Sequence, residues 1–222
     1  MYSILMSKFN EGFYLIEEQL KKIINKNSNI VIIPWSFATE LKSKNIDEFF
    51  DETKKNSYLN HLYRLGVKEK NIKILDCYND NKEDMIKEIN NSNAIILTGG
   101  NPEMLYNKII ENGLLETLQN YKEIIVGSSA GAELQLKKYF ITRKNNCYKK
   151  FAWYDGFGII DNDFYFDVHS INKGRYLPSL KKRSIHLNKK IYCLFDNGSI
   201  IYNRNTKKIA CYGKYILFDG TK

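Results

Sequence analysis

The stretch Ile124-Ile125-Val126-Gly127-Ser128-Ser129-Ala130-Gly131-Ala132 contains the most informative pattern in this chain. An apolar strand pattern runs into a Gly-x-Ser-x-Gly turn, and the run from Glu133 to Lys138 is predicted to be helical. This layout is typical of a nucleophile elbow, in which a serine lies on a tight strand-to-helix turn and flanking glycines leave room for its hydroxyl group. The spacing selects Ser129, because glycines around Ser128 would have to stand at positions 126 and 130.

The rest of the chain has the pattern of an α/β fold. Short apolar runs typical of buried strands alternate with amphipathic runs typical of helices. The strands are predicted at residues 29–34, 72–75, 94–97 and 123–126, and the helices at residues 13–24, 47–66, 81–89 and 102–112. Strands joined by helices of this length form a parallel sheet with helices on both faces. We therefore expect a three-layer, doubly wound, mostly parallel sheet, with the functional site at the carboxyl ends of its strands.

Length and composition indicate one domain. A chain of 222 residues, of which 43% are hydrophobic, is long enough for one sizeable core over residues 1–222. No apolar run approaches the roughly 20 residues of a transmembrane helix, and the first residues lack the regions of a signal peptide. We expect a cytoplasmic protein with no membrane partner. The cysteines lack the spacing of metal ligands, so we expect reduced thiols and no metal; they are Cys77, Cys147, Cys193 and Cys211.

The formal net charge of +9 raises the question of a nucleic-acid partner. Only five of the 34 basic residues are arginines, and the lysines are spread along the whole chain. Lysine is less suited than arginine to bidentate recognition of bases and phosphates, and no basic block is interleaved with aromatic residues. The charge is therefore better explained by lysine-rich, solvated helix faces, and we expect no nucleic-acid partner.

A second strand end carries the run Leu97-Thr98-Gly99-Gly100-Asn101-Pro102. Paired glycines let the backbone approach a ligand closely, whereas Asn101 as a helix N-cap and Pro102 at the first helical position also fit a plain strand-to-helix turn. The carboxyl ends of neighbouring parallel strands converge. The main-chain N–H groups of Gly100 and Ala130 could therefore point together at one developing oxyanion, which acyl transfer requires.

A serine nucleophile needs a base, and the chain has three histidines. His61 lies in a predicted helix and is expected at the surface, while His186 lies in a basic run that is expected to be exposed. His169 ends the alternating, strand-like run 164–169 and so lies at a strand terminus, as Ser129 does. We therefore expect His169 to be the base.

The third member of a triad must be an acid that orients the imidazole ring. Asp196 follows the apolar run 191–195 and lies at a strand-to-turn junction. Two alternatives remain: Asp-Asn-Gly is a strong hairpin signal, and Asp167 lies two residues before His169. The order Ser, His, acid differs from the Ser, acid, His order of α/β-hydrolases, which argues against that fold.

These motifs together resemble peptidase family S51, which includes dipeptidase E and cyanophycinase. The matching segments span most of the chain in the family's order; they are 98–101, 127–132, 156–169 and 194–199. The resemblance implies a fold like that of class I glutamine amidotransferases, on a flavodoxin-like sheet. It also implies Ser129 as nucleophile, His169 as base, Asp196 as acid, and Gly100 and Ala130 as the oxyanion hole. The chain departs from the family in having Asp196 where Glu is more common, and Ser128 where dipeptidase E has a bulkier residue.

The function that we expect is that of a serine-type dipeptidase acting on short peptides with an acidic, Asp-like N-terminal residue. Lys173 and Arg175 are candidate contacts for a substrate carboxylate, with solvated loop charges as the alternative, and Asn101 could donate to the substrate. No metal or organic cofactor is implied, the expected partner is a small peptide, and the protein would be a monomer or homodimer. The alternatives are a non-catalytic or cyanophycinase-like member of the same fold and, ranked last, a nucleic-acid binder.

Overall fold

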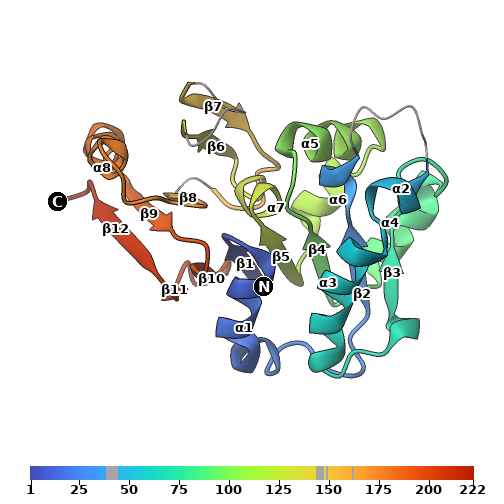
Figure 1. Ribbon diagram of the computed structural model, residues 1–222. Helices are drawn as coiled ribbons and strands as arrows, with labels where there is room; N and C mark the ends of the chain where they lie inside the picture. Colours follow the sequence, from blue (N-terminus) through green and yellow to red (C-terminus); the bar gives the residue numbers. More distant parts are fainter. Residues whose placement is uncertain (39–44, 144–147, 149, 162) are drawn as a thin grey trace.

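The computed structural model describes residues 1–38, 45–143, 148, 150–161 and 163–222 (Figure 1). Cys147 and the residues 39–44, which stand between the strand predicted at 29–34 and the helix predicted at 47–66, lie outside the described residues. The fold is built on a seven-stranded sheet with the order β11-β10-β1-β5-β4-β2-β3. Its strands are β1 (Tyr2–Met6), β2 (Ile30–Ile33), β3 (Ile72–Ile74), β4 (Ala94–Leu97), β5 (Ile124–Ser128), β10 (Ser199–Asn203) and β11 (Ile209–Tyr212).

The prediction of a mostly parallel α/β sheet is confirmed. Strands β1, β5, β4, β2 and β3 run parallel to their neighbours, while β10 and β11 extend the sheet in antiparallel pairing. Across the sheet, β3, β2, β4, β5 and β1 follow one another, each parallel to the next. The carboxyl ends of β1, β4 and β5 therefore meet at one edge of the sheet.

Strand β1 was not predicted, although it lies inside the sheet. The run is short, contains the polar Ser3 and does not alternate, so neither length nor periodicity marks it as a strand. Its burial comes from both neighbours: Ile4 pairs with Val126 of β5 on one side and with Ile201 of β10 on the other. The N-terminus thus supplies a strand next to the one that carries Ser129.

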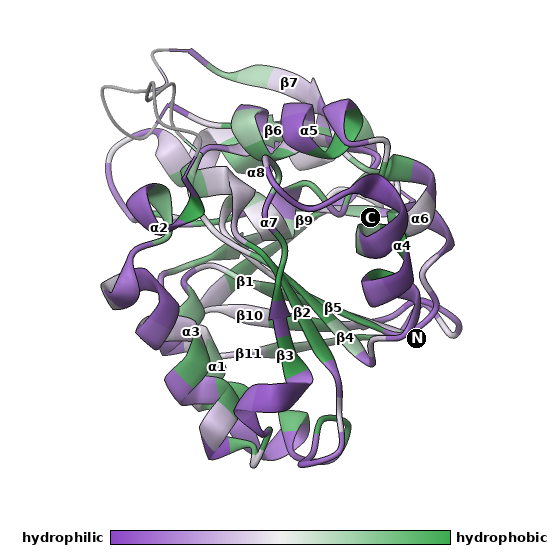
Figure 2. Cartoon of the chain, turned by 90° about the vertical axis from the view of Figure 1, so that its right-hand side faces the viewer, coloured by the Kyte–Doolittle hydropathy of each residue, from purple (hydrophilic) through white to green (hydrophobic). Residues whose placement is uncertain are grey.

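Helices cover both faces of the sheet (Figure 2). The helices α1 (Phe9–Leu20) and α3 (Glu52–Arg64) lie on one face, and α4 (Lys82–Asn90) and α6 (Leu115–Asn120) lie on the other. The apolar residues gather in the sheet between these layers, and the largest buried cluster extends from Ile4 to Tyr202. Helix α5 (Pro102–Glu111) begins at the predicted Asn101–Pro102 start.

Two helix predictions differ from the structure in their bounds. The helix expected at residues 13–24 is α1, which begins earlier at Phe9 and ends at Leu20. The helix expected at residues 47–66 is two helices, α2 (Ile46–Phe49) and α3, because the side chain of Asp51 accepts a hydrogen bond from the N–H of Lys54 and caps a new start.

The helix predicted from Glu133 to Lys138 is wrong. Helix α7 (Ala130–Glu133) has only four residues, and β6 (Lys138–Ile141) begins where the helix was expected to end. Main-chain groups from a distant segment bind those of the predicted helix: the N–H of Phe157 donates to Leu134, and the N–H of Lys137 donates to Ile160. Strand β6 then pairs with β7 (Ala152–Asp155).

The C-terminal part forms a second, three-stranded sheet with the order β12-β9-β8. Its strands are β8 (Phe164–Asp167), β9 (Lys190–Leu194) and β12 (Tyr215–Asp219), and α8 (Tyr176–Leu187) connects β8 to β9. The turn Asp196-Asn197-Gly198 links β9 to β10, which belong to different sheets. The hairpin alternative for this turn is therefore wrong, because its flanking strands do not pair with each other.

Three further expectations concern single residues and membrane spans. His61 is buried rather than exposed, and its ring packs against those of Phe9, Phe13 and Tyr14. Three of the four cysteines, Cys77, Cys193 and Cys211, are free. None of the helices in the described part of the chain combines the length and the apolar composition needed to cross a membrane.

Candidate active site

Ser129 lies on the tight turn between β5 and α7, as the glycine spacing predicts. Its φ of 47° and ψ of −116° are unusual for a residue with a side chain, and its N–H donates to the carbonyl oxygen of Met6 at 2.9 Å. Gly131 makes the turn possible, because a Cβ atom there would lie 2.2 Å from the carbonyl oxygen of Leu97. The strained backbone presents the Ser129 hydroxyl group at the carboxyl edge of the sheet.

The structure brings Ser129, His169 and Asp196 into one line of contacts. The Oγ atom of Ser129 lies 2.9 Å from Nε2 of His169, and Nδ1 of His169 lies 3.0 Å from Oδ1 of Asp196. An ionised carboxylate accepts hydrogen bonds only, so it favours the tautomer with the proton on Nδ1 and leaves Nε2 to accept the serine proton. This is the geometry of a Ser-His-acid triad.

His169 and Asp196 both come from the C-terminal sheet. His169 follows β8 by two residues, and its φ of 51° makes it, like Ser129, a non-glycine residue in the left-handed region. Its main-chain N–H donates to Oγ of Ser7 at 2.7 Å. Asp196 follows the end of β9 by two residues. The parallel pairing of β8 with β9 is what places the two side chains together.

The carboxylate of Asp196 is held in its charged form. Burial raises the pKa of Asp196, but hydrogen bonds from Lys8 and His169 and their charges outweigh this and hold the pKa below its ordinary value. The Nζ atom of Lys8 lies 2.8 Å from Oδ2 of Asp196, and the same contact raises the pKa of Lys8. Asp196 is therefore ready to orient the imidazole ring at neutral pH.

Asp167, the alternative acid, belongs to a different cluster. It is fully buried and accepts hydrogen bonds from the hydroxyl groups of Thr142, Ser170 and Tyr176. Among the described contacts, none joins its carboxylate to the ring of His169. The geometry therefore favours Asp196 as the acid of the triad, and Asp167 as a structural carboxylate beneath the His169 loop.

The Gly99-Gly100 turn faces the nucleophile. Gly100 has a φ of 142°, and a Cβ atom there would lie 2.7 Å from the carbonyl oxygen of Ser36, so only glycine fits. Ser36 also accepts from the N–H of Asn101 at 2.9 Å, which fixes the turn. Within the described residues, no acceptor is paired with the N–H of Gly100 or of Ala130. Both N–H groups are therefore available to a ligand beside Ser129.

A pocket of about 410 Å³ lies next to Ser129 and His169, a volume typical of small-molecule sites. Gly100, Asn101 and Ala130 form part of its wall. The side-chain oxygen of Asn101 already accepts from the N–H groups of Glu103 and Met104, which is the N-cap role that the sequence left open.

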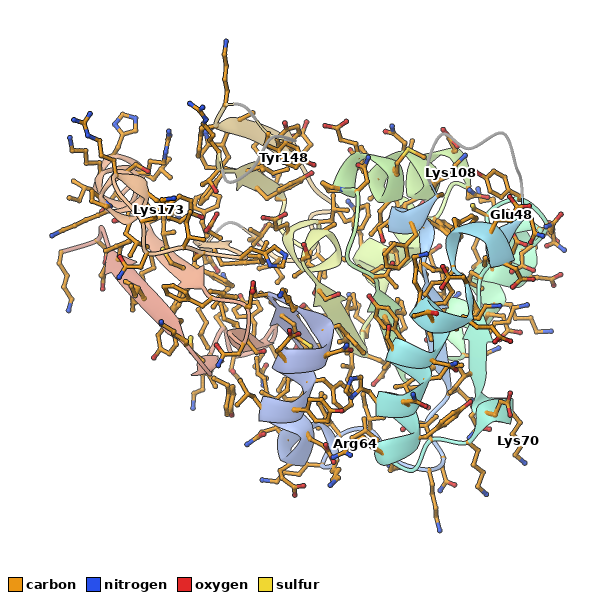
Figure 3. The ribbon with its side chains drawn as sticks, in the orientation of Figure 1. Glu48, Arg64, Lys70, Lys108, Tyr148 and Lys173 are labelled. Atoms are coloured by element: carbon orange, nitrogen blue, oxygen red, sulfur yellow. The ribbon has the colours of Figure 1, made fainter. Side chains whose placement is uncertain are left out.

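Lys173 and Arg175 do not line this pocket. Both are exposed, and Figure 3 shows Lys173 beside α8, whereas Tyr148 lies by the β6–β7 pair. The wall instead contains Glu133, Thr142 and Tyr148, which the sequence did not single out. Glu133 lies four residues after Ser129, and on a helix this spacing places two side chains on the same face, so the sequence could have indicated Glu133 as a residue of the site. The sequence around Thr142 and Tyr148 contains no pattern that indicates a position near Ser129. Within the described residues, no cluster of His, Cys, Asp or Glu side chains could hold a metal ion.

Two solved structures are similar to this chain in fold. A peptidase from an acI-B1 Actinobacterium has a TM-score of 0.68 and 18% identity, covering 99% of this chain and 91% of that chain. A protein provisionally named peptidase E, from Listeria monocytogenes EGD-e, has a TM-score of 0.66 and 18% identity, covering 95% and 96%. No curated protein matches the chain. The sequence model of peptidase family S51 matches residues 4–210, a range that includes Ser129, His169 and Asp196. The chain therefore belongs to peptidase family S51.

Proposed function

We propose that this protein is a serine peptidase that cleaves short peptides with the triad Ser129, His169 and Asp196. The observation that carries the proposal is the continuous line of contacts, 2.9 Å from Ser129 to His169 and 3.0 Å from His169 to Asp196. Ser129 and His169 line a pocket whose wall also includes Gly100 and Ala130, the residues of the proposed oxyanion hole. Membership in peptidase family S51 supports the same chemistry.

The mechanism follows from the positions of the groups. Ser129 attacks the scissile carbonyl carbon while Nε2 of His169 takes the hydroxyl proton, and Asp196 stabilises the imidazolium ion that results. The N–H groups of Gly100 and Ala130 donate to the oxyanion of the tetrahedral intermediate. His169 then gives its proton to the leaving amine, which leaves an acyl-enzyme on Ser129. Water, activated by His169, hydrolyses this ester and restores the free serine.

The substrate that we propose is a dipeptide or short peptide whose N-terminal residue is acidic, with Asp preferred. The resemblance to dipeptidase E motivates this choice, and the pocket volume of about 410 Å³ suits a ligand of dipeptide size. The flavodoxin-like description of the sheet, a cytoplasmic location and a monomeric or homodimeric state belong to the same proposal. It includes no nucleic acid and no membrane among the partners.

The proposal is tested by incubating the purified protein with dipeptides that begin with Asp, Glu, Lys or a neutral residue, and by measuring products with mass spectrometry. We expect cleavage of the Asp-first peptides by the wild type and none by Ser129→Ala. Ser128→Ala is the matched control, because Ser128 is the buried neighbour of the nucleophile and should leave cleavage intact.

The same panel, with a branched aspartate polymer added, separates the alternatives. Cleavage that depends on Ser129 but prefers another N-terminal residue would keep the mechanism and overturn the acidic specificity. Cleavage of a branched aspartate polymer alone would favour a cyanophycinase-like enzyme. No turnover of any substrate would favour a non-catalytic member of the family.

A further inference from the structure

Three consecutive residues at the carboxyl end of β1 each hold one member of the triad. The carbonyl oxygen of Met6 accepts from the N–H of Ser129 at 2.9 Å. The hydroxyl oxygen of Ser7 accepts from the N–H of His169 at 2.7 Å, and the Nζ atom of Lys8 lies 2.8 Å from the carboxylate of Asp196. The triad residues are far apart in the sequence, so this tripeptide is a common point of attachment for them.

Ser7 connects the base to the segment that carries the acid. It is fully buried, and besides accepting from His169 it directs its hydroxyl group at the carbonyl oxygen of Leu194, at 3.5 Å. Leu194 ends β9 and stands two residues before Asp196. The N–H of Ser7 also donates to Gly198, on the other side of the acid. Ser7 therefore gives the main-chain N–H of His169 a fixed acceptor at a residue whose φ is positive.

Lys8 holds Asp196 at two points. Its Nζ atom contacts Oδ2, which leaves Oδ1 for His169 at 3.0 Å, and its main-chain N–H donates to the carbonyl oxygen of Asp196 at 3.2 Å. Because both carboxylate oxygens are engaged, rotation of the carboxylate would break one contact or the other. Glu11 lies 3.7 Å from Nζ of Lys8 and helps to keep the ammonium group in place.

We propose that Ser7 and Lys8 are positioning residues, which align His169 and Asp196 with Ser129 by attaching all three to the end of β1. This proposal rests on the proposed function in one respect: it takes Ser129, His169 and Asp196 to be the groups that react with the substrate. The side chains of Lys8 and Asp196 are 43% and 53% exposed, and an ion pair this exposed adds little to stability. The ion pair instead fixes the orientation of the Asp196 carboxylate, and the rate of a reaction is far more sensitive to the orientation of its groups than stability is to an exposed ion pair.

The chain offers matched controls for both residues. Lys21 forms ion pairs with Glu17 and Glu18 and is 42% exposed, so Lys21→Met removes a comparable surface ion pair away from the site. Ser3 lies on β1, four residues before Ser7, and is equally buried, and its hydroxyl group has no hydrogen-bond partner among the described residues. Ser3→Ala therefore controls for the loss of a buried hydroxyl group from β1.

The first readout is activity measured beside thermal stability. We expect Lys8→Met to lower kcat for the cleaved peptide on the order of tenfold, with a melting temperature that changes no more than that of Lys21→Met. Lys8→Arg keeps a cationic donor and should restore most of the activity. Ser7→Ala removes the acceptor of the His169 N–H, so it should lower the melting temperature more than Ser3→Ala does. At a temperature well below both melting temperatures, where both variants are folded, we expect kcat to be lower in Ser7→Ala than in Ser3→Ala.

The second readout needs no substrate. Nitrogen-15 spectra of histidine-labelled protein report which ring nitrogen carries the proton, and with three histidines His169 is assigned by its loss in His169→Gln. We expect the Nδ1–H tautomer of His169 in the wild type and in Lys8→Arg, and a shift toward Nε2–H in Lys8→Met. An unchanged tautomer in Lys8→Met, or activity lost only in step with stability, would overturn the proposal. Absence of peptide cleavage by the wild type would instead overturn the proposed function, and the tautomer would still decide the role of Lys8.

Discussion

The two halves of the candidate site are built by different means. The nucleophile half consists of the Ser129 turn and the Gly99-Gly100 turn, and close backbone packing fixes it: a Cβ on Gly131 would lie 2.2 Å from Leu97, and one on Gly100 would lie 2.7 Å from Ser36. The base and acid half is held by polar contacts, among them the hydrogen bond from the N–H of His169 to Ser7 and the ion pair of Lys8 with Asp196. The side chain of Asp196 is 53% exposed, so close packing does not fix its position.

This difference determines what a mutation does in each half. Where backbones touch, an added atom has no space, so a change acts first on folding. Where a polar contact between exposed side chains sets the geometry, as between Lys8 and Asp196, a change leaves the fold intact and lowers the rate. The predictions below test this division, beginning with the largest expected effect.

The largest effect should come from the acid in the polar half. Asp196→Asn removes the negative charge that stabilises the imidazolium ion, and we expect kcat to fall between about 10²- and 10⁴-fold with little loss of stability. Asp167→Asn is the counterpart, because that carboxylate is buried among three hydroxyl groups and its loss should lower stability by about 1–3 kcal/mol. Kinetics and chemical denaturation of both variants check this. A large fall in kcat in Asp167→Asn, with kcat unchanged in Asp196→Asn, would make Asp167 the acid of the triad.

The next effect belongs to the packed half. Gly131→Ala places a methyl group against the end of β4, and we expect a loss of about 3 kcal/mol in the free energy of unfolding, or no folded protein. Gly174→Ala is the control: no atom lies within 4 Å of the added Cβ, so the substitution is opposed only by the positive φ of Gly174, 54°, which Gly131 does not share. It should lose about 1 kcal/mol. Equal losses in urea denaturation would contradict the role of close packing.

Stability should also depend on pH through His61. Burial lowers the pKa of His61 below its ordinary 6.5, the charge of Arg64 lowers it further, and Glu17 opposes both. As the pH falls below 6.5, the unfolded chain binds a proton at His61 that the folded chain does not, so stability is lost toward the folded pKa. We expect a smaller decline between pH 7 and pH 5 in His61→Phe than in wild type. His186→Gln, at an exposed position, should keep the full decline.

The smallest effect should come from the loop after His169. Lys173 and Arg175 are exposed and stand outside the pocket wall, so Lys173→Ala and Arg175→Ala should each change KM by less than about twofold. A marked rise in KM for Asp-first peptides alone would show that these side chains reach the substrate.

The same division explains how much could be predicted from the sequence. The parallel strands β2 to β5 and the turns at Gly100 and Ser129 can be predicted from local patterns. Apolar runs indicate buried strands, and glycines stand where the backbone of a tight turn leaves no space for a side chain. Strand β1 was missed, and with it the contacts of Ser7 and Lys8. Those contacts join residues more than 150 positions apart, as in the bond from His169 to Ser7, and leave no local pattern.

The most direct test of the account is the reaction of the protein with a fluorophosphonate, which modifies serines that a neighbouring histidine activates. Intact-protein and peptide mass spectrometry would locate the adduct. We predict a single adduct on Ser129, none on Ser128, and a much slower reaction in His169→Ala. An unmodified wild type, an adduct on another serine, or equal labelling of wild type and His169→Ala would contradict a triad built on Ser129.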